Sequence, residues 1–475
     1  MLDHIKISHA EQKEFASLSG DYNPIHMDQI IARRLMYGQC IVHGINLVLK
    51  SLDKWLSNKQ ELVRLSSLKV KFIEHTNIGE ELCYVCKETL SGVRIELYNE
   101  SIKKVKIDFV YIEGVTASPQ EKCKDSLPPK LNPKVMLVDE MKGFSGDVKM
   151  YFPELKISNY YPYLFDYLSH QQISVLLATT RLVGMECPGM HSIYSELSLN
   201  YDDNCNYSML NYHVDEFDER FNMTSIGFVG PQINGVITSF LRQGKNEQKK
   251  YTDIVPDIVE DEFAGQRALI IGGSRGLGET VAKTLSAGGA SVYITYHNGR
   301  DDAERVVSEI IEYGGNAESY KFDVLSGDAS KLIDNIKGTP PTHLYYFATP
   351  FISQDRTKNF SVDAFNKFCL YYVEGFVKLF DLLLDIGVKH YYYPSTVYVD
   401  ELPKGLGEYS SAKSAGEVMC KYLEKNNKAA NVYRPKLPMM KTDQTVGLLK
   451  HAGIESSPIM LESIRKFGQY MKSNK

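Results

Sequence analysis

The chain contains 475 residues, and at about 150 residues per domain this length favours roughly three domains over one compact unit. Hydrophobic residues make up 43% and charged residues 24%, which is typical of globular proteins and excludes a disordered or collagen-like chain. The 54 basic and 59 acidic residues give a formal net charge of −5, so no positive field draws the chain to nucleic acid. Small-molecule chemistry is therefore the expected function class.

The eight cysteines are widely spaced, which excludes a dense disulfide framework and indicates reduced thiols. Cys83 and Cys86 form a CxxC pair, but no second pair completes a zinc site, and we expect no metal. The first residues lack the basic cap and apolar core of a signal peptide, and no segment reaches the roughly 18 apolar residues of a membrane span. The sequence predicts a soluble, cytoplasmic protein.

Two segments have the composition of linkers. Residues 118–134 contain four prolines among many charges, and residues 251–262 are strongly acidic. These segments divide the chain into three predicted domains, at residues 1–118, 135–250 and 264–475.

The first domain combines one helix with strands. Apolar residues from 45 to 56 recur at the spacing of an amphipathic helix, and strand-like runs follow at 68–73, 81–89, 93–98 and 105–111. One long helix against an antiparallel sheet fits this order. A helical stretch near residues 163–183 and later strand-like runs repeat the order in the middle domain, which predicts a second copy of the same α+β architecture.

The third domain alternates apolar runs with helical patterns. The runs at 268–271, 292–295, 344–348, 391–394 and 432–433 predict a doubly wound parallel sheet with helices on both faces. Between the first run and a helical pattern stands a glycine-rich loop, where small residues allow the backbone to approach a diphosphate at a helix N-terminus. The predicted cofactor-binding residues of this loop are Gly272, Ser274, Arg275, Gly276, Leu277 and Gly278.

The expected cofactor is NADP(H). The second strand ends with Thr295-Tyr-His-Asn298, without the carboxylate that usually receives the ribose hydroxyl of NAD. Arg275 and Arg300 lie where a guanidinium can pair with a 2′-phosphate. We count Asn298 among the cofactor-binding residues.

Tyr409 and Lys413 are four residues apart, a spacing that places both side chains on one face of a helix. A nearby ammonium is expected to lower the pKa of the phenol, which could then give a proton to a developing alkoxide. Ser395, at the end of the strand before this helix, could donate a hydrogen bond to a substrate carbonyl.

With these three elements in this order, residues 264–475 resemble the short-chain dehydrogenase/reductase family. The resemblance implies a Rossmann fold and hydride transfer between NADPH and a carbonyl carbon. It implies Tyr409 as the acid, Lys413 at the nicotinamide ribose, Ser395 at the carbonyl and Asp323 beside the adenine. Two departures affect the family's proton relay: Ala348-Thr-Pro350 replaces an Asn-Ala-Gly motif, and Tyr372 replaces a helix asparagine.

Near the start of the chain, Asp21 and His26 are separated by five positions within Ser-Gly-Asp-Tyr-Asn-Pro-Ile-His. A carboxylate can orient an imidazole or share proton transfer with it. Ile-Val-His-Gly44 then leads into the amphipathic helix, whose first N–H groups are unpaired donors suited to an oxyanion.

These two motifs resemble the MaoC-like hot-dog hydratases, which act on enoyl thioesters. The resemblance implies that Asp21 and His26 add or remove water across the α,β bond, with the Gly44 amide polarising the thioester carbonyl. It implies a double hot-dog fold over the first two domains. No Asp/His motif recurs in the middle domain, where we expect a structural role, with His170 and His191 as packing or polar-network residues.

The sequence thus predicts a bifunctional enzyme, an NADPH-dependent 3-oxoacyl-thioester reductase joined to a 3-hydroxyacyl-thioester dehydratase. Its substrate would ride on CoA or on an acyl-carrier protein, and a homo-oligomer is compatible with both kinds of domain. Two alternatives stay open. The same steps could run oxidatively, from enoyl-CoA hydration to alcohol oxidation, or the C-terminal domain could bind nucleotide as a scaffold without turnover.

Overall fold

The computed structural model describes residues 3–114, 125–202, 208–336, 340–352, 360–445 and 453–473. The described chain divides into two compact units, one within residues 1–244 and one that begins at residue 245. Both predicted α+β halves belong to the first unit, because they contribute strands to one common sheet.

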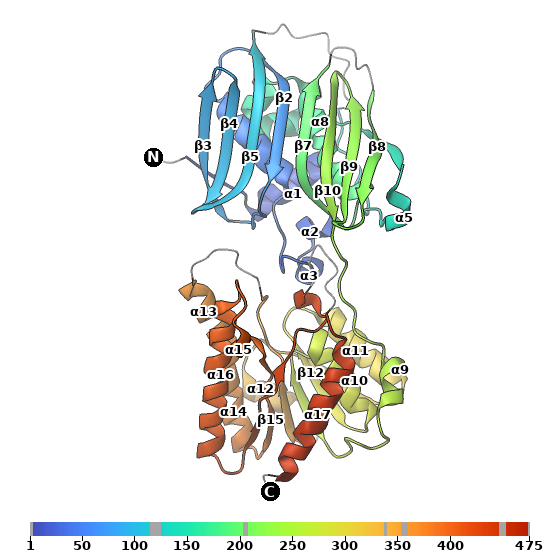
Figure 1. Ribbon diagram of the computed structural model, residues 1–475, viewed down its shortest axis with the longest axis vertical. Coiled ribbons are helices and arrows are strands. Elements are labelled where there is room, and N and C mark those ends of the chain that lie inside the picture. Colours follow the sequence, from blue (N-terminus) through green and yellow to red (C-terminus); the bar gives the residue numbers. More distant parts are fainter. Residues whose placement is uncertain are drawn as a thin grey trace. The chain divides into compact units, whose positions relative to one another are not determined.

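The N-terminal unit contains a ten-stranded antiparallel sheet with the order β1-β3-β4-β5-β2-β7-β10-β9-β8-β6 (Figure 1). The two halves join where β2 pairs with β7, from Ser67 opposite Asn200 to Lys71 opposite Glu196. The strands are β1 (Asp3–Lys6), β2 (Val63–Phe72), β3 (Glu81–Thr89), β4 (Gly92–Asn99), β5 (Ile102–Glu113), β6 (Ser145–Lys149), β7 (Ser192–Tyr201), β8 (Met209–Asp218), β9 (Met223–Gly230) and β10 (Ile233–Leu241).

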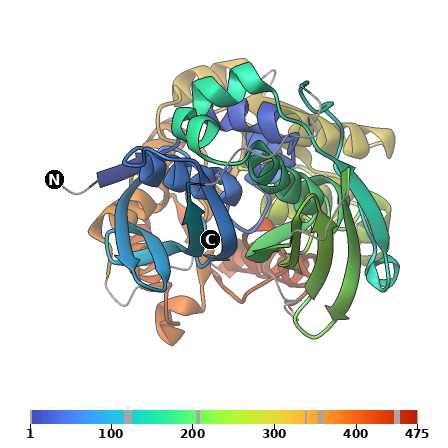
Figure 2. The ribbon, with the colours of Figure 1, turned by 90° about the horizontal axis from the view of Figure 1, so that it is seen from above.

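The helices of this unit gather on one side of the curved sheet (Figure 2). Helix α4 buries the apolar stripe that its sequence predicts, including Ile45, Val48 and Leu52, against strand residues such as Leu68 and Ile107. Each such buried side chain contributes about 1.5–3 kcal/mol. The helices are α1 (His9–Ser19), α2 (Pro24–Met27), α3 (Gln29–Ala32), α4 (Gly44–Leu56), α5 (Val138–Met141), α6 (Glu154–Tyr160), α7 (Pro162–Tyr167) and α8 (His170–Arg181), which continues into the π-helical turn η1 (Leu182–Glu186).

The C-terminal unit contains a six-stranded parallel sheet with the order β13-β12-β11-β14-β15-β17. Successive residues of β11 point into two different cores, Ile270 on one face and Leu269 on the other, because helices cover both faces. The strands are β11 (Arg267–Ile271), β12 (Ser291–Tyr296), β13 (Asn316–Lys321), β14 (His343–Tyr346), β15 (His390–Tyr392) and β17 (Asn431–Tyr433), with a separate parallel pair, β16 (Ser395–Thr396) and β18 (Lys436–Leu437).

The helices around this sheet begin with α9 (Tyr251–Ile254) and the 3-10 turn η2 (Val255–Asp257). They continue with α10 (Gly276–Ala287), α11 (Arg300–Glu312), α12 (Ala329–Asn335), α13 (Val362–Cys369), the π-helical turn η3 (Leu370–Glu374), α14 (Gly375–Asp385), α15 (Tyr398–Glu401), α16 (Gly407–Asn426), the 3-10 turn η4 (Asp443–Thr445) and α17 (Ser456–Ser473).

The predicted fold class is confirmed. A hot-dog-like antiparallel sheet with central helices precedes a Rossmann-like parallel sheet. Among the residues described, no helix combines the length and the apolar character that a membrane crossing requires.

Candidate active sites

The loop after α1 carries the first predicted catalytic residue, Asp21. Helix α1 ends at Gly20, whose φ of +74° reverses the chain at low cost for glycine. Asn23 then caps α2, since its Oδ1 accepts the Ile25 N–H at 3.1 Å. The Asn23 amide also donates to the Gly184 carbonyl at 2.8 Å, which fixes the loop to the second half of the unit.

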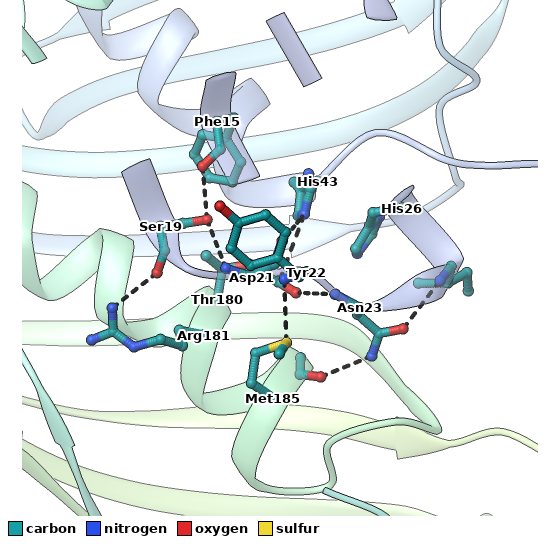
Figure 3. A network of polar contacts seen from close by, with 12 residues as sticks. Phe15, Ser19, Asp21, Tyr22, Asn23, His26, His43, Thr180, Arg181 and Met185 are labelled. Atoms are coloured by element: carbon teal, nitrogen blue, oxygen red, sulfur yellow. Dashed lines mark hydrogen bonds and ion pairs between the residues drawn. The ribbon is translucent and has the colours of Figure 1, made fainter. Parts of the chain in front are cut away.

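The structure brings together Asp21 and His26, and it adds His43 (Figure 3). One potential metal-ligating atom of each of the three side chains lies within 4.8 Å of those of the other two. The rings of His26 and His43 stack with centroids 4.0 Å apart. His43 lies in the Ile-Val-His-Gly motif but was not among the predicted site residues.

Backbone carbonyls determine the tautomers of both imidazoles. His26 Nδ1 donates to the Ile41 carbonyl at 2.9 Å, so the Nε2 atom of a neutral His26 keeps its lone pair. His43 Nε2 donates to the Asp21 carbonyl at 3.0 Å, while its buried Nδ1 has no hydrogen-bond partner. The neutral His26 is therefore suited to accept a proton.

Burial shifts the pKa values of this cluster in opposite directions. Desolvation raises the pKa of the Asp21 carboxyl, although the charge of His26 opposes the shift. Desolvation lowers the pKa of His26 despite the charge of Asp21, and the pKa of His43 falls well below its usual range. Burial thus disfavours the charged form of each of the three side chains.

The second half supplies the surroundings of Asp21. Thr180, on α8, donates its hydroxyl to Asp21 Oδ2 at 2.7 Å. Gly184, in η1, packs against the same carboxylate, and a Cβ there would lie 2.4 Å from Oδ1. Arg181 donates to the Ser19 carbonyl at 3.0 Å, just before the loop that carries Asp21. These contacts could not be predicted from the sequence, because they join residues about 160 positions apart.

Gly44 is the first residue of α4, where backbone N–H groups have no acceptor within the helix. A Cβ at this position would lie 2.6 Å from the Phe72 ring, so only glycine allows β2 and the helix to approach this closely. Of the two middle-domain histidines, His170 stacks on Phe152 with ring centroids 4.2 Å apart, and His191 lies 3.4 Å from Arg242.

A metal ion could in principle be held by Asp21, His26 and His43, which are the one such group among the residues described. However, both oxygens of Asp21 accept hydrogen bonds, from Asn23 N–H and from Thr180, and His43 Nε2 donates to a carbonyl. We therefore derive no step through a metal.

The glycine-rich loop lies between β11 and α10 and has the shape of a diphosphate cradle. Gly272 and Gly276 have φ values of +79° and +57°, and a Cβ on Gly278 would lie 2.3 Å from the Gly272 carbonyl. Thr295 Oγ1 accepts the Gly272 N–H at 3.1 Å. The residues present therefore fit a dinucleotide at the N-terminus of α10. Ser274 is buried and Leu277 half-buried in this loop.

The arginines predicted to receive a 2′-phosphate both have carboxylate partners. Arg275 Nη1 lies 3.1 Å from Asp443 Oδ2, and Arg300 Nε lies 2.6 Å from Glu304 Oε1. Asn298 is exposed after β12. The predicted adenine-side residue, Asp323, accepts the hydroxyl of Ser326 at 2.6 Å.

Tyr409 and Lys413 both lie on α16, but the ammonium is directed elsewhere. Lys413 Nζ donates to the Pro394 carbonyl at 2.8 Å and lies 4.0 Å from the centre of the Tyr372 ring. Burial lowers the pKa of Lys413 to about 7. Burial also raises the pKa of Tyr409 to about 12, against a hydrogen bond with Thr396. The expected lowering of the phenol pKa is not found, because desolvation has the largest influence on Tyr409 and the hydrogen bond with Thr396 opposes it only in part.

The hydroxyl beside Tyr409 belongs to Thr396, not to the predicted Ser395. Ser395 donates its hydroxyl to Glu417 Oε1 at 2.5 Å. The two residues are adjacent in β16, where successive side chains point to opposite faces. Thr396 was not among the predicted site residues, although it directly follows Ser395 in the sequence.

The two departures from the family pattern contact each other. Tyr372, in η3, shares a 2.6 Å hydrogen bond between its hydroxyl and Thr349 Oγ1. Its carbonyl accepts the hydroxyl of Tyr393 at 3.0 Å. The Tyr372 ring held by these bonds is the one that lies beside the Lys413 ammonium.

Comparison with known families agrees with both resemblances. Residues 2–101 match the model of the MaoC like domain family, and residues 266–339 match that of the short chain dehydrogenase family. Versicolorin reductase stcU of Emericella nidulans is 44% identical over 71 residues, 15% of this chain and 27% of that protein. L-rhamnose 1-dehydrogenase (NADP(+)) of Thermoplasma acidophilum is 37% identical over 62 residues, 13% of this chain and 24% of that protein. The chain thus spans about a quarter of the length of these curated relatives.

Two solved structures are similar to parts of the chain. A short chain dehydrogenase from Burkholderia cenocepacia in complex with NADP has 20% identity and a TM-score of 0.38, over 43% of this chain and 91% of that chain. A 3-oxoacyl (acyl-carrier-protein) reductase from Agrobacterium tumefaciens with NADP bound has 17% identity and a TM-score of 0.35, over 39% and 74%. The chain therefore joins a MaoC-like domain in its N-terminal part to a short-chain dehydrogenase domain in its C-terminal part.

Proposed function

We propose that the chain reduces a 3-oxoacyl thioester with NADPH and then dehydrates the 3-hydroxyacyl thioester to a trans-2-enoyl thioester. The observation that carries the dehydratase half is the cluster of buried Asp21 and His43 with half-buried His26, in which His43 immediately precedes α4. Fusion would raise the effective concentration of the shared intermediate without any new contact.

In the dehydration, His26 Nε2 takes the α-proton of the thioester, because its Nδ1 is held as a donor to Ile41. The Cα–H electrons form the double bond as the C3–O bond breaks. A protonated Asp21 gives its proton to the leaving hydroxyl, which departs as water. Proton transfer from His26 back to Asp21 restores the site. The raised pKa of Asp21 and the lowered pKa of His26 favour these starting states.

Negative charge grows on the thioester oxygen as the α-proton leaves. The unpaired N–H groups at the start of α4 are donors for such an oxygen, with Gly44 first among them. The tight packing of Gly44 on Phe72 fixes this end of the helix. Removal of a single oxyanion donor typically costs about 10²–10³ in rate.

In the reduction, bound NADPH would supply the hydride. The glycine loop would hold its diphosphate, Thr396 would donate a hydrogen bond to the substrate carbonyl, and Tyr409 would give its proton to the forming alkoxide. Arg275 would exchange Asp443 for the 2′-phosphate. Lys413 would hold the ribose after leaving the Pro394 carbonyl.

Conversion of acetoacetyl-CoA in the presence of NADPH tests the proposal. Wild-type protein given NADPH and acetoacetyl-CoA should consume cofactor and form crotonyl-CoA, which mass spectrometry identifies. Tyr409→Phe should stop cofactor consumption but leave dehydration of 3-hydroxybutyryl-CoA, whereas Asp21→Asn should do the reverse. Undiminished NADPH consumption by Tyr409→Phe would remove the reductase assignment.

A second candidate is a dehydratase whose C-terminal unit binds nucleotide without turnover. The observation that favours it is the position of the Lys413 ammonium, against Pro394 and the Tyr372 ring. NADPH binding measured by fluorescence, without oxidation across a panel of ketoacyl thioesters, would support this candidate over the bifunctional enzyme.

A further inference from the structure

Arg242 is a buried cation directly after β10, in the N-terminal unit. Arg242 is only 3% exposed to solvent. The guanidinium donates to the Met190 carbonyl at 2.6 Å and to the Gln243 carbonyl at 3.4 Å, and it lies 3.4 Å from His191 Nδ1. Its partners are thus neutral groups.

Within the described ranges, Arg242 forms no ion pair with an Asp or Glu side chain. Burial lowers its pKa to about 10, and the opposing influence comes from the Tyr37 phenol. Arg181, the comparable buried arginine of this unit, has the charges of Glu186 and Asp21 nearby. A buried charge without a counter-charge is costly, so an anion at Arg242 would be strongly favoured.

Two buried donors at this place lack acceptors. Arg242 Nε and Gln243 Nε2 are inaccessible to solvent and have no hydrogen-bond partner in the part of the chain that the structure describes. A guanidinium N–H can only donate, so the missing partner must be an acceptor. Leaving such donors unpaired in a buried place is unfavourable. An acceptor such as an oxyanion, rather than an apolar group, would satisfy each of these donors.

Arg242 belongs to the surroundings of the dehydratase cluster. The Met190 carbonyl that accepts its Nη2 also accepts the Asn23 amide at 3.4 Å, and Asn23 lies in the catalytic loop. The positive charge of Arg242 contributes to lowering the pKa of His26. Arg242 and the loop that carries Asp21 therefore share the Met190 carbonyl as an acceptor.

We propose that Arg242, together with Gln243, binds an oxyanion carried by the thioester substrate. The inference rests on the proposed dehydratase function and names its substrate class, a thioester with an anionic group. Two parts of such a substrate can supply that oxyanion, a carboxylate on the acyl chain or a phosphate of the pantetheine arm.

Three thioesters separate the two sources. The N-acetylcysteamine thioester of 3-hydroxybutyrate carries no anion, and that of 3-hydroxyglutarate carries one carboxylate. 3-Hydroxybutyryl-CoA has the same acyl group as the first and carries phosphates on its CoA moiety. The measurement is kcat/KM for dehydration by the full chain, expressed as the ratio of each anionic substrate to the neutral one. Arg242→Gln should lower one of the two ratios at least about tenfold. Arg64→Gln, which removes a cation bonded to Tyr201, should leave both ratios unchanged.

The affected ratio identifies the source of the anion. A loss confined to 3-hydroxyglutarate assigns Arg242 to an acyl carboxylate, and a loss confined to the CoA thioester assigns it to a phosphate. An equal loss on all three substrates would overturn the proposal, because it would make Arg242 a structural support of Met190.

Binding provides a readout that does not need turnover. Calorimetry with the same thioesters should show the anion preference in the Asp21→Asn chain and its loss in the Asp21→Asn, Arg242→Gln chain. If the wild type dehydrates none of the thioesters while this difference in affinity persists, the proposed reaction fails and the anion site stands. Equal affinities in both chains would overturn the anion site alone.

Discussion

Asp21 is the proposed acid of the dehydration, and burial of its carboxyl is also unfavourable for the stability of the fold. It is 1% exposed, and desolvation raises its pKa above the value of about 3.9 for a free Asp side chain. The unfolded chain therefore loses its proton at lower pH than the folded chain does. Stability should fall as pH rises from the unfolded pKa through the folded pKa, since the folded state binds more protons in this window.

Asp21→Asn should separate these two properties. We expect dehydration to fall by about 10²–10⁴-fold, because the variant lacks the acid. Its free energy of unfolding relative to wild type should increase from pH 4 to pH 7, as urea titrations at both values can measure. The exposed Asp215→Asn serves as control. A relative stability that decreases with pH would contradict the raised pKa.

Thr396 and Ser395 provide a matched pair at the second site. Thr396 bonds with Tyr409, whereas Ser395 bonds with Glu417 on α16. Thr396→Val should lower kcat/KM of the reductase by about 10²-fold, as removal of one donor to a substrate oxygen does. Ser395→Ala should cost less than tenfold on the same scale. The reverse order in steady-state assays would return the carbonyl donor to Ser395.

At the scale of elements, α8 and η1 give the second half a part in the site. Gly184→Ala places a Cβ 2.4 Å from Asp21 Oδ1, so we expect the carboxylate to shift and dehydration to fall at least about tenfold. NADPH consumption should stay unchanged, because Gly184 lies in the other unit. Gly468→Ala, in α17 with no atom near the new Cβ, is the helical control. Wild-type dehydration by Gly184→Ala would contradict this support.

The sequence predicted those parts of the sites that are local in the chain. Asp21, His26 and Gly44 stand in short motifs before one amphipathic helix, whose stripe of buried residues follows directly from its spacing. Thr180 could not be predicted, because its contact with Asp21 spans 159 positions and depends on how the two halves share a sheet.

The sequence also does not determine which of two neighbouring residues faces a site. Ser395 and Thr396 both carry hydroxyls, and the strand's direction alone decides which one faces Tyr409. Similarly, the pairing of Arg275 with Asp443 joins positions 168 apart. Local spacing predicts the glycine loop, but it does not reveal which carboxylate its arginine meets.

For the whole molecule, the two units make separable contributions to one proposed sequence of reactions. Each compact unit has its own core and its own candidate site. Single substitutions in one site should therefore leave the other reaction intact. A mixture of Tyr409→Phe and Asp21→Asn chains should restore net conversion of 3-oxoacyl to enoyl thioester, because the intermediate can diffuse between chains.

The most direct measurement follows acetoacetyl-CoA with NADPH by mass spectrometry in wild type, in the two single variants and in their mixture. We expect crotonyl-CoA from wild type and from the mixture, 3-hydroxybutyryl-CoA accumulation with Asp21→Asn, and unchanged acetoacetyl-CoA with Tyr409→Phe. A folded wild type that leaves acetoacetyl-CoA unreduced, or that forms 3-hydroxybutyryl-CoA without ever losing water, would contradict the bifunctional assignment.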